Sequence, residues 1–379
     1  MTLNDTDATT DANTLSNATG PGSPTAIYSN LDTAFWICIV TTVVIGLVGN
    51  AFIFPLMRDV KFSSLSYPVY LIFLAVSDST VLIMYCIYQT LRFFDSFHII
   101  GKNVAACRLW LFLMSTVTLL SPWLVVGLTV DRFFCVVFPM KRDRFCTPRK
   151  AKIVCSCLTA LSVLLMLPLL EGVKVIEKSN ICFIKDHLLV YFAFFRISIN
   201  SNLPCLLIIV FNVVIGIHIQ RSTNFRKRFT STSSGSTENK LDKSLLPLML
   251  ISLMALVTFL PSSLADSIVT ILVITKSYPN TLKQVAKFSP SFIVLYLINF
   301  GQNFYILMAS SANYRKIMKK KLKCQRIFGE KKNVTELRVS GQVSDTKANT
   351  TELSTRESLY SGSTSVISPA TDFSEGSTK

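Results

Sequence analysis

The sequence predicts an all-α membrane protein, a seven-transmembrane helix bundle with a short amphipathic eighth helix. Half of the 379 residues are hydrophobic and only 16% are charged, whereas soluble domains carry about 25% charged residues. The apolar residues fall into seven blocks of about 20 residues or more, each long enough to cross a hydrocarbon layer of roughly 30 Å. Basic residues gather at the ends of these blocks. These observations exclude a soluble enzyme and a disulfide-rich secreted module.

The seven blocks are too long for strands, and in lipid a helix satisfies its own backbone hydrogen bonds. We therefore expect a disordered extracellular arm at 1–33, the bundle at 34–310, an amphipathic membrane-surface helix at 311–324 and a cytoplasmic Ser/Thr-rich tail at 325–379. The expected spans are 34–57, 67–91, 108–139, 151–171, 188–219, 244–275 and 289–310.

The distribution of charge predicts the orientation of the spans. The formal net charge of +16 would by itself suggest a nucleic-acid partner. With the N-terminal arm outside, however, the inner segments before the tail carry 23 basic residues and the outer segments carry nine. Because inner loops are enriched in Lys and Arg, we expect a plasma-membrane protein with its N-terminus outside, its C-terminus inside and no nucleic-acid partner. Glycosylation sequons at Asn4 and Asn17 agree with this orientation.

Polar residues inside spans are costly and usually functional. Ser121 precedes Arg132 by about three helical turns, and Asn299 and Asn303, four residues apart, are expected to share one helix face. A carboxylate with Ser and Asn oxygens can hold sodium at Asp78, or the same groups can only join helices; the sequence leaves both interpretations open. The polar residues expected in the interior of the bundle are Asn50, Asp78, Ser121, Asn299 and Asn303.

Several motifs occur in a specific order along the spans. They are Gly49-Asn50 in the first span, LAVSD at 74–78 in the second, Asp131-Arg132-Phe133 ending the third, and Pro204 and Pro261 in the fifth and sixth. Together they resemble a rhodopsin-like (class A) G-protein-coupled receptor over about residues 30–325. The resemblance implies a receptor rather than an enzyme, with a heterotrimeric G protein and arrestin as inner partners. It also implies a disulfide between Cys107 and Cys182, and G-protein coupling through Asp131 and Arg132.

A finer resemblance concerns the ligand. The segment 130–152 and the NFGQNF stretch at 299–304 are similar to invertebrate neuropeptide receptors of the FMRFamide type, which implies an extracellular peptide ligand. Met114 stands where receptors for amines carry an Asp. Arg196 and Asp266 can either pair with each other or bind opposite charges on a peptide ending in Arg-Phe-amide. The residues expected to face the ligand are Gln89, Arg92, Trp110, Met114, Glu171, Arg196, Phe259 and Asp266.

The sequence departs from the family pattern in its switch residues. The seventh-span NPxxY appears as Asn303–Leu307 without its Pro and Tyr, and Asn212 replaces the usual fifth-span Tyr. These changes put in doubt the water-bridged Tyr–Tyr contact of the family's active state. Cys324 follows a run of lysines, where a palmitoyl group would anchor the chain to membrane lipids; the alternative is an unmodified thiol.

Other functions fit the sequence less well than a receptor does. A receptor of the same family for a non-peptide small molecule or a lipid remains the main alternative. A transporter is more remote, because its internal repeats are missing from the sequence. An opsin needs a Lys in the seventh span, and the window Ser291–Gln302 contains none. An intramembrane enzyme would need paired acids, HExxH or a Ser/His pair inside the spans, and none occurs.

Overall fold

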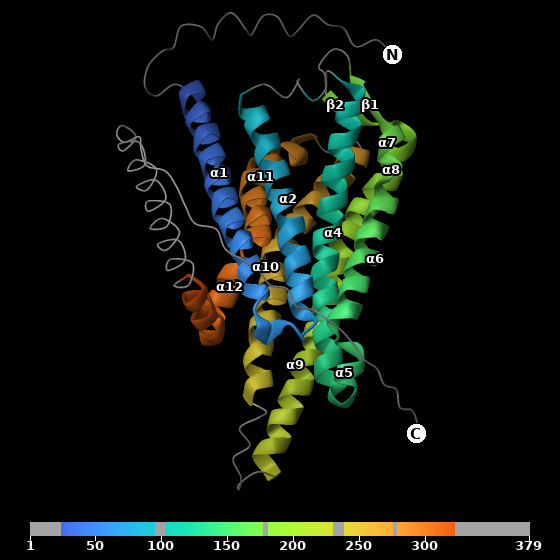
Figure 1. Ribbon diagram of the computed structural model, residues 1–379. Coiled ribbons are helices and arrows are strands. Elements are labelled where there is room, and N and C mark those ends of the chain that lie inside the picture. The colour runs from blue at the N-terminus through green and yellow to red at the C-terminus, as the bar shows by residue number, and fades with distance from the viewer. Residues whose placement is uncertain are drawn as a thin grey trace, which may run out of the picture. The chain divides into compact units, whose positions relative to one another are not determined.

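The computed structural model describes residues 24–94, 100, 103–176, 181–229, 239–275 and 279–322. Within these ranges the chain forms a bundle of long helices with one short hairpin (Figure 1). The sequons, Cys324 and the tail lie outside the described residues, so the predictions on them stay predictions.

The prediction of a seven-span helical membrane protein is confirmed. Within the described residues, six single helices are long and apolar enough to cross a membrane, and a bent pair brings the number to seven when it is counted as one span. Large apolar side chains such as Val44, Ile153 and Val213 are about half exposed on the outside of the bundle, as lipid-facing positions require. The main helices of the spans are α1 (Pro24–Met57), α2 (Tyr67–Phe93), α4 (Val104–Val137), α6 (Pro148–Met166), α9 (Leu203–Phe229), α10 (Asn239–Thr275), α11 (Pro279–Gly301) and α12 (Asn303–Ser310).

Short elements connect the long helices and end them. Residues 312–322 form a further helix within the predicted amphipathic segment. The fifth span is composite, because α8 and the π-helical segment η3 precede α9. The short elements are η1 (Val60–Phe62), η2 (Pro139–Lys141), α5 (Arg142–Phe145), α7 (Leu169–Gly172), β1 (Val173–Ile176), β2 (Ile181–Ile184), α8 (Asp186–Phe194) and η3 (Phe195–Asn202).

Several helix ends, and one break within a span, differ from the sequence prediction. Helix α1 begins at Pro24, so the last part of the expected arm is helical. Apolar composition marks the membrane-embedded part of a helix, whereas a polar stretch with Pro at its first position can extend the helix beyond it. The seventh span is also not one straight helix, because Pro290–Gly301 and Asn303–Ser310 are bent by 62° at Gln302.

Helix α4 lies at the centre of the bundle and packs against α2, α6, α9 and α10, while α1 packs against α2 and α11. The side chain of Asn103 accepts a hydrogen bond from the Ala105 N–H at the start of α4, which satisfies a free helix donor. At the same end, β1 and β2 pair antiparallel with Val175 opposite Cys182. Figure 1 shows this hairpin beside the end of α4 that is far from α5. The Cys107–Cys182 disulfide joins hairpin and helix, as the resemblance implied.

Candidate functional site

A pocket of about 560 Å³ opens between the helices at the hairpin end of the bundle. Its size lies within the usual range for ligand sites, roughly 300–1,000 Å³. Helices α2, α4, α10 and α11 and the segment η3 supply most of its wall. Seven of the eight residues predicted to face a ligand line it, namely Gln89, Arg92, Trp110, Met114, Arg196, Phe259 and Asp266.

Glu171 is the exception among these predictions. It lies on the single-turn helix α7, is exposed, and is not among the pocket-lining residues. The sequence placed it near the end of a span, but hydropathy does not reveal which way a side chain points from a short helix. Glu171 therefore lies outside the pocket lining, and its contact with a ligand stays a prediction.

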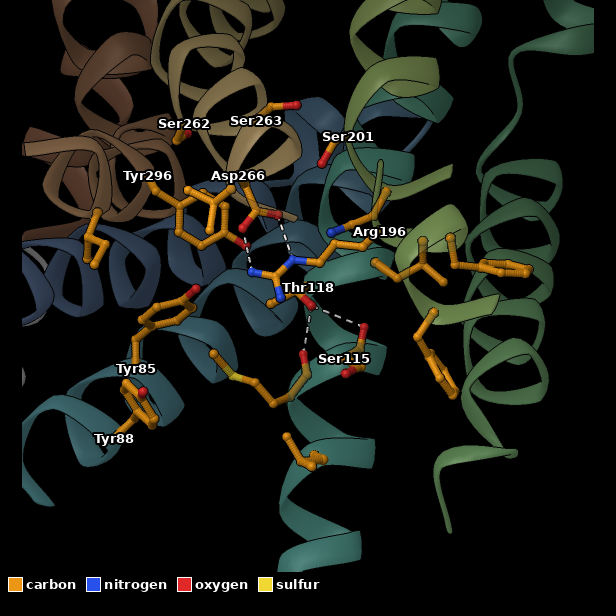
Figure 2. A pocket seen from close by; sticks show the side chains of 18 of the residues that line it. Tyr85, Tyr88, Ser115, Thr118, Arg196, Ser201, Ser262, Ser263, Asp266 and Tyr296 are labelled. Carbon is orange, nitrogen blue, oxygen red and sulfur yellow. Dashed lines mark hydrogen bonds and ion pairs between the residues drawn. The ribbon is translucent and has the colours of Figure 1, made fainter. Parts of the chain in front are cut away.

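Arg196 and Asp266 form a bidentate ion pair across the pocket. Arg196 Nε donates to Asp266 Oδ2 at 2.6 Å, and Nη2 donates to Oδ1. Figure 2 shows the guanidinium reaching from one helix toward the carboxylate on the other, with Tyr296 beside it. The pair is open to the pocket, because the Arg196 and Asp266 side chains are 60% and 32% exposed. Of the two interpretations left open by the sequence, self-pairing describes this structure.

Aromatic side chains form another part of the wall. The ring centroid of Tyr296 lies 4.7 Å from that of Phe300, 5.4 Å from that of Tyr85 and 5.9 Å from that of Phe259. Tyr85 was missed by the sequence reasoning. Its spacing from Gln89 was a usable signal, because residues four apart share a helix face.

Two polar atoms in the pocket wall are buried and unpaired. Ser263 Oγ and Asn200 Oδ1 have no hydrogen-bond partner within the described part of the chain. Buried polar groups are normally satisfied, so these two atoms are available to a polar ligand. Neither residue stood out in the sequence.

The polar interior of the bundle divides into separate groups. Asp78 is buried, accepts a hydrogen bond from Ser121 through Oδ1, and accepts one from Asn303 Nδ2 through Oδ2 at 2.9 Å. Asn50 donates instead to the Phe300 carbonyl at 3.0 Å. These bonds join α2 to α4 and α12, and α1 to α11.

Asn299 belongs to a different group from Asp78. Its Oδ1 accepts from Thr258 at 3.2 Å and from Gln302 at 3.3 Å, and Gln302 also donates to the Thr258 hydroxyl at 3.1 Å. The expectation that Asn299 and Asn303 share one helix face is wrong, because the helix breaks at Gln302 between them. Gln302 lies within the NFGQNF stretch, but the sequence does not indicate this hydrogen-bonding role.

At the α5 end of the bundle, Arg132 is buried in a network of four side chains. It pairs with Asp131, and its Nη2 donates to Ser66 Oγ at 3.0 Å. Ser66 in turn donates to Asp131 Oδ2 at 2.7 Å. The guanidinium carbon lies 5.1 Å from the centre of the Tyr67 ring, a favourable cation–π distance. Tyr314 donates to the Tyr67 hydroxyl at 3.1 Å, which connects the 312–322 helix to this network.

Ser66, Tyr67 and Tyr314 were not predicted, because each is an ordinary polar residue at a helix end. In the fifth span, Asn212 accepts from Ser252 of α10 at 2.9 Å. The residue that replaces the usual Tyr thus forms a direct polar link to the sixth span.

The fold is that of a seven-transmembrane receptor, with a pocket that opens between the helices at one end of the bundle. The sequence pattern of the family described as 7 transmembrane receptor (rhodopsin family) matches residues 49–327, and the chain belongs to this family. Somatostatin receptor type 5 of Rattus norvegicus is 28% identical over 164 residues. That match covers 43% of this chain and 44% of the rat receptor.

Proposed function

We propose that this protein is a G-protein-coupled receptor for an extracellular peptide bound in the pocket at the hairpin end. The observation that carries the proposal is the solvent-open Arg196–Asp266 pair, which presents both signs of charge inside the pocket. Met114 lines the pocket where an amine receptor would need a carboxylate. The similarity to a somatostatin receptor supports a peptide ligand.

Because the Arg196–Asp266 pair is exposed, a charged group of a ligand can replace either partner. Ion pairs in contact with water contribute only about 0–1 kcal/mol, so a ligand can separate Arg196 from Asp266 at little cost. A guanidinium on the ligand would take over Asp266 in the same bidentate geometry. Arg196 would then be free to bind a carbonyl or carboxylate of the ligand, and a peptide carries both kinds of group.

We further propose that the hairpin end faces outward and the α5 end faces the cytoplasm, where Arg132 contacts a G protein. The basic residues around α5 and the start of α6 support this orientation. In the resting arrangement Asp131, Ser66 and Tyr67 hold Arg132 inside the bundle. Coupling requires Arg132 to leave these partners. The Ser/Thr-rich tail is proposed to bind arrestin once phosphorylated.

Sodium is proposed as an allosteric ligand at Asp78. The carboxylate and the Ser121 hydroxyl offer the oxygen ligands that such an ion needs. Asn303 faces the carboxylate with its Nδ2 and would have to turn its oxygen inward to join the site. Asn299 is bonded elsewhere and is not part of this proposal.

The test is a screen of amidated peptides on cells that express the chain, with calcium and cyclic-AMP readouts. Asp266→Asn is expected to cost an Arg-containing agonist about 2 kcal/mol, or roughly 30-fold in potency. Glu171→Gln is the matched control, because Glu171 is an acid near the same end but outside the pocket lining. It should leave potency unchanged.

A charge swap separates ligand recognition from simple helix packing. The double variant Arg196→Asp, Asp266→Arg keeps an internal pair but exchanges the two charges in the pocket. If the pair only joins helices, the swap should restore the parent's response to an Arg-containing peptide. If Asp266 binds the peptide, the response should stay low and recover with a peptide carrying Glu in place of Arg.

Activation by an amine or a fatty acid at lower concentration than any peptide would refute the proposal of a peptide ligand. Arg132→Ala should keep ligand binding and lose G-protein activation.

A further inference from the structure

Two cysteines and an aspartate converge at the α5 end of the bundle, outside the ligand pocket. Asp131 and Cys135 lie one helical turn apart on α4, and Cys146 directly follows α5. A carboxylate oxygen and the two Sγ atoms all lie within 4.8 Å of one another. Asp131 and Cys135 are buried, and Cys146 is half-buried, so the cluster can be reached from the side of Cys146.

The backbone holds the three residues in place. Positions i and i+4 share one face of a helix, which puts the Asp131 and Cys135 side chains together. The turn η2 and helix α5 then reverse the chain, and the Cys146 N–H donates to the Arg142 carbonyl at 2.8 Å. The Cys146 thiol donates to the Asp131 carbonyl oxygen at 3.5 Å. Cys146 is therefore directed at α4.

We propose that Asp131, Cys135 and Cys146 bind a zinc ion. Two thiolates and a carboxylate are zinc ligands, at about 2.3 Å for sulfur and 2.0–2.2 Å for oxygen, and three protein ligands leave a fourth position for water. The three ligand atoms lie within 4.8 Å of one another, so one ion can contact all three once the side chains draw together. Magnesium and calcium prefer oxygen ligands alone, so two sulfurs select against them.

The charges of the loaded site balance. With both thiols protonated and Asp131 and Arg132 carrying opposite charges, the unloaded site has no net charge. Binding of one Zn²⁺ releases the two thiol protons, which leaves an ion of charge +2, two thiolates, one carboxylate and the Arg132 guanidinium. The total charge is zero before and after binding. The zinc ion and its three ligands together carry one negative charge. The guanidinium of Arg132, which is adjacent to Asp131, compensates this charge.

The consequence of zinc binding rests on the proposed G-protein coupling. The ion would hold the Asp131 carboxylate in its present place and tie the chain after α5 to α4. Because Asp131 keeps Arg132 inside the bundle, zinc would favour the resting arrangement. By linkage, a ligand of the resting state weakens the binding of any partner that needs the active state. Zinc is therefore expected to reduce agonist-driven G-protein activation.

The test is metal binding to the purified full-length protein in detergent, kept reduced and freed of metal. Zinc affinity is measured by competition with a chromophoric chelator, and Co²⁺ is added as a spectroscopic probe of thiolate ligation. We expect one zinc per chain and a sulfur-to-cobalt charge-transfer band. Cys146→Ser should weaken zinc binding at least tenfold and diminish the band. Cys157→Ser is the matched control, because Cys157 is an exposed cysteine of α6, and it should behave as the parent.

The metal-free melting temperature of Cys146→Ser should equal that of the parent, which shows that the variant folds. Equal zinc affinities for parent and Cys146→Ser, or the lack of a thiolate band, would overturn the site. Zinc should also lower G-protein activation in membranes of the parent but not of Cys146→Ser. If the parent binds zinc through Cys146 and yet activates no G protein with any agonist, the metal site stands and the proposed receptor function fails.

Discussion

The close contact between α1 and α11 allows a quantitative test of the packing. Gly301 ends α11 beside Gly46 of α1, and a Cβ added to Gly301 would lie 2.6 Å from Gly46 Cα. Non-bonded carbons prefer about 3.5–4.0 Å. The obstructing atom belongs to the backbone, so no side-chain rotation relieves the clash. Gly301→Ala must therefore move the two helices apart by about 1 Å.

The expected cost follows from overpacking in cores, about 1–3 kcal/mol. Ala also stabilises a helix relative to Gly by as much as about 1 kcal/mol. This gain in stability has to be separated from the cost of the clash. Gly216→Ala provides the separation, because a Cβ at Gly216 of α9 meets nothing within 4 Å. The two variants should differ by about 1–3 kcal/mol, or roughly 2–10 °C in melting temperature.

Thermal unfolding of the detergent-purified protein can be followed with a thiol-reactive fluorophore, because Cys155 and Cys205 are buried until the bundle opens. Gly46→Ala should lower the melting temperature less than Gly301→Ala does. Its Cβ first meets the tip of Leu82 at 2.7 Å and then Gly301 Cα at 3.1 Å, and the Leu side chain can move. If Gly301→Ala has the same melting temperature as Gly216→Ala, α1 and α11 do not approach each other as closely as described.

Three further predictions concern the proposed receptor function. Cys182→Ala should release the hairpin from α4 at a cost of about 2–4 kcal/mol and abolish surface expression or ligand binding, measured beside Cys157→Ala. Raising sodium at constant ionic strength should lower agonist affinity in the parent, and Asp78→Asn should remove this dependence. Tyr314→Phe deletes the donor to Tyr67, worth about 1 kcal/mol, and should raise basal G-protein signalling at unchanged ligand affinity.

Each of these three has a clear contrary result. Normal ligand binding by Cys182→Ala would show that the disulfide does not hold the pocket together. If sodium does not change the agonist affinity of the parent protein, the proposed sodium site at Asp78 is wrong. Basal signalling of Tyr314→Phe equal to that of the parent would mean that the 312–322 helix does not restrain Arg132 through Tyr67.

The sequence alone determined which segments cross the membrane, because burial in lipid depends on the composition of a segment and not on its neighbours. Motif order was enough to identify the family and the Cys107–Cys182 disulfide. Seven of the eight residues predicted to face a ligand also line the pocket. Helix periodicity and span depth place residues such as Gln89 and Asp266 on inward faces near one end, without knowledge of their partners.

Which polar groups meet in the interior depends on how the helices pack in three dimensions. Asn299 bonds to Thr258 and Gln302 rather than to Asp78, because the seventh span bends at Gln302. The meeting of Cys146 with Asp131 depends on how the chain turns after α4. Such contacts join residues from different helices, and their geometry follows from helix rotation and close approach. Rotation and approach are set by the packing of side chains across the bundle, which no single segment of sequence contains.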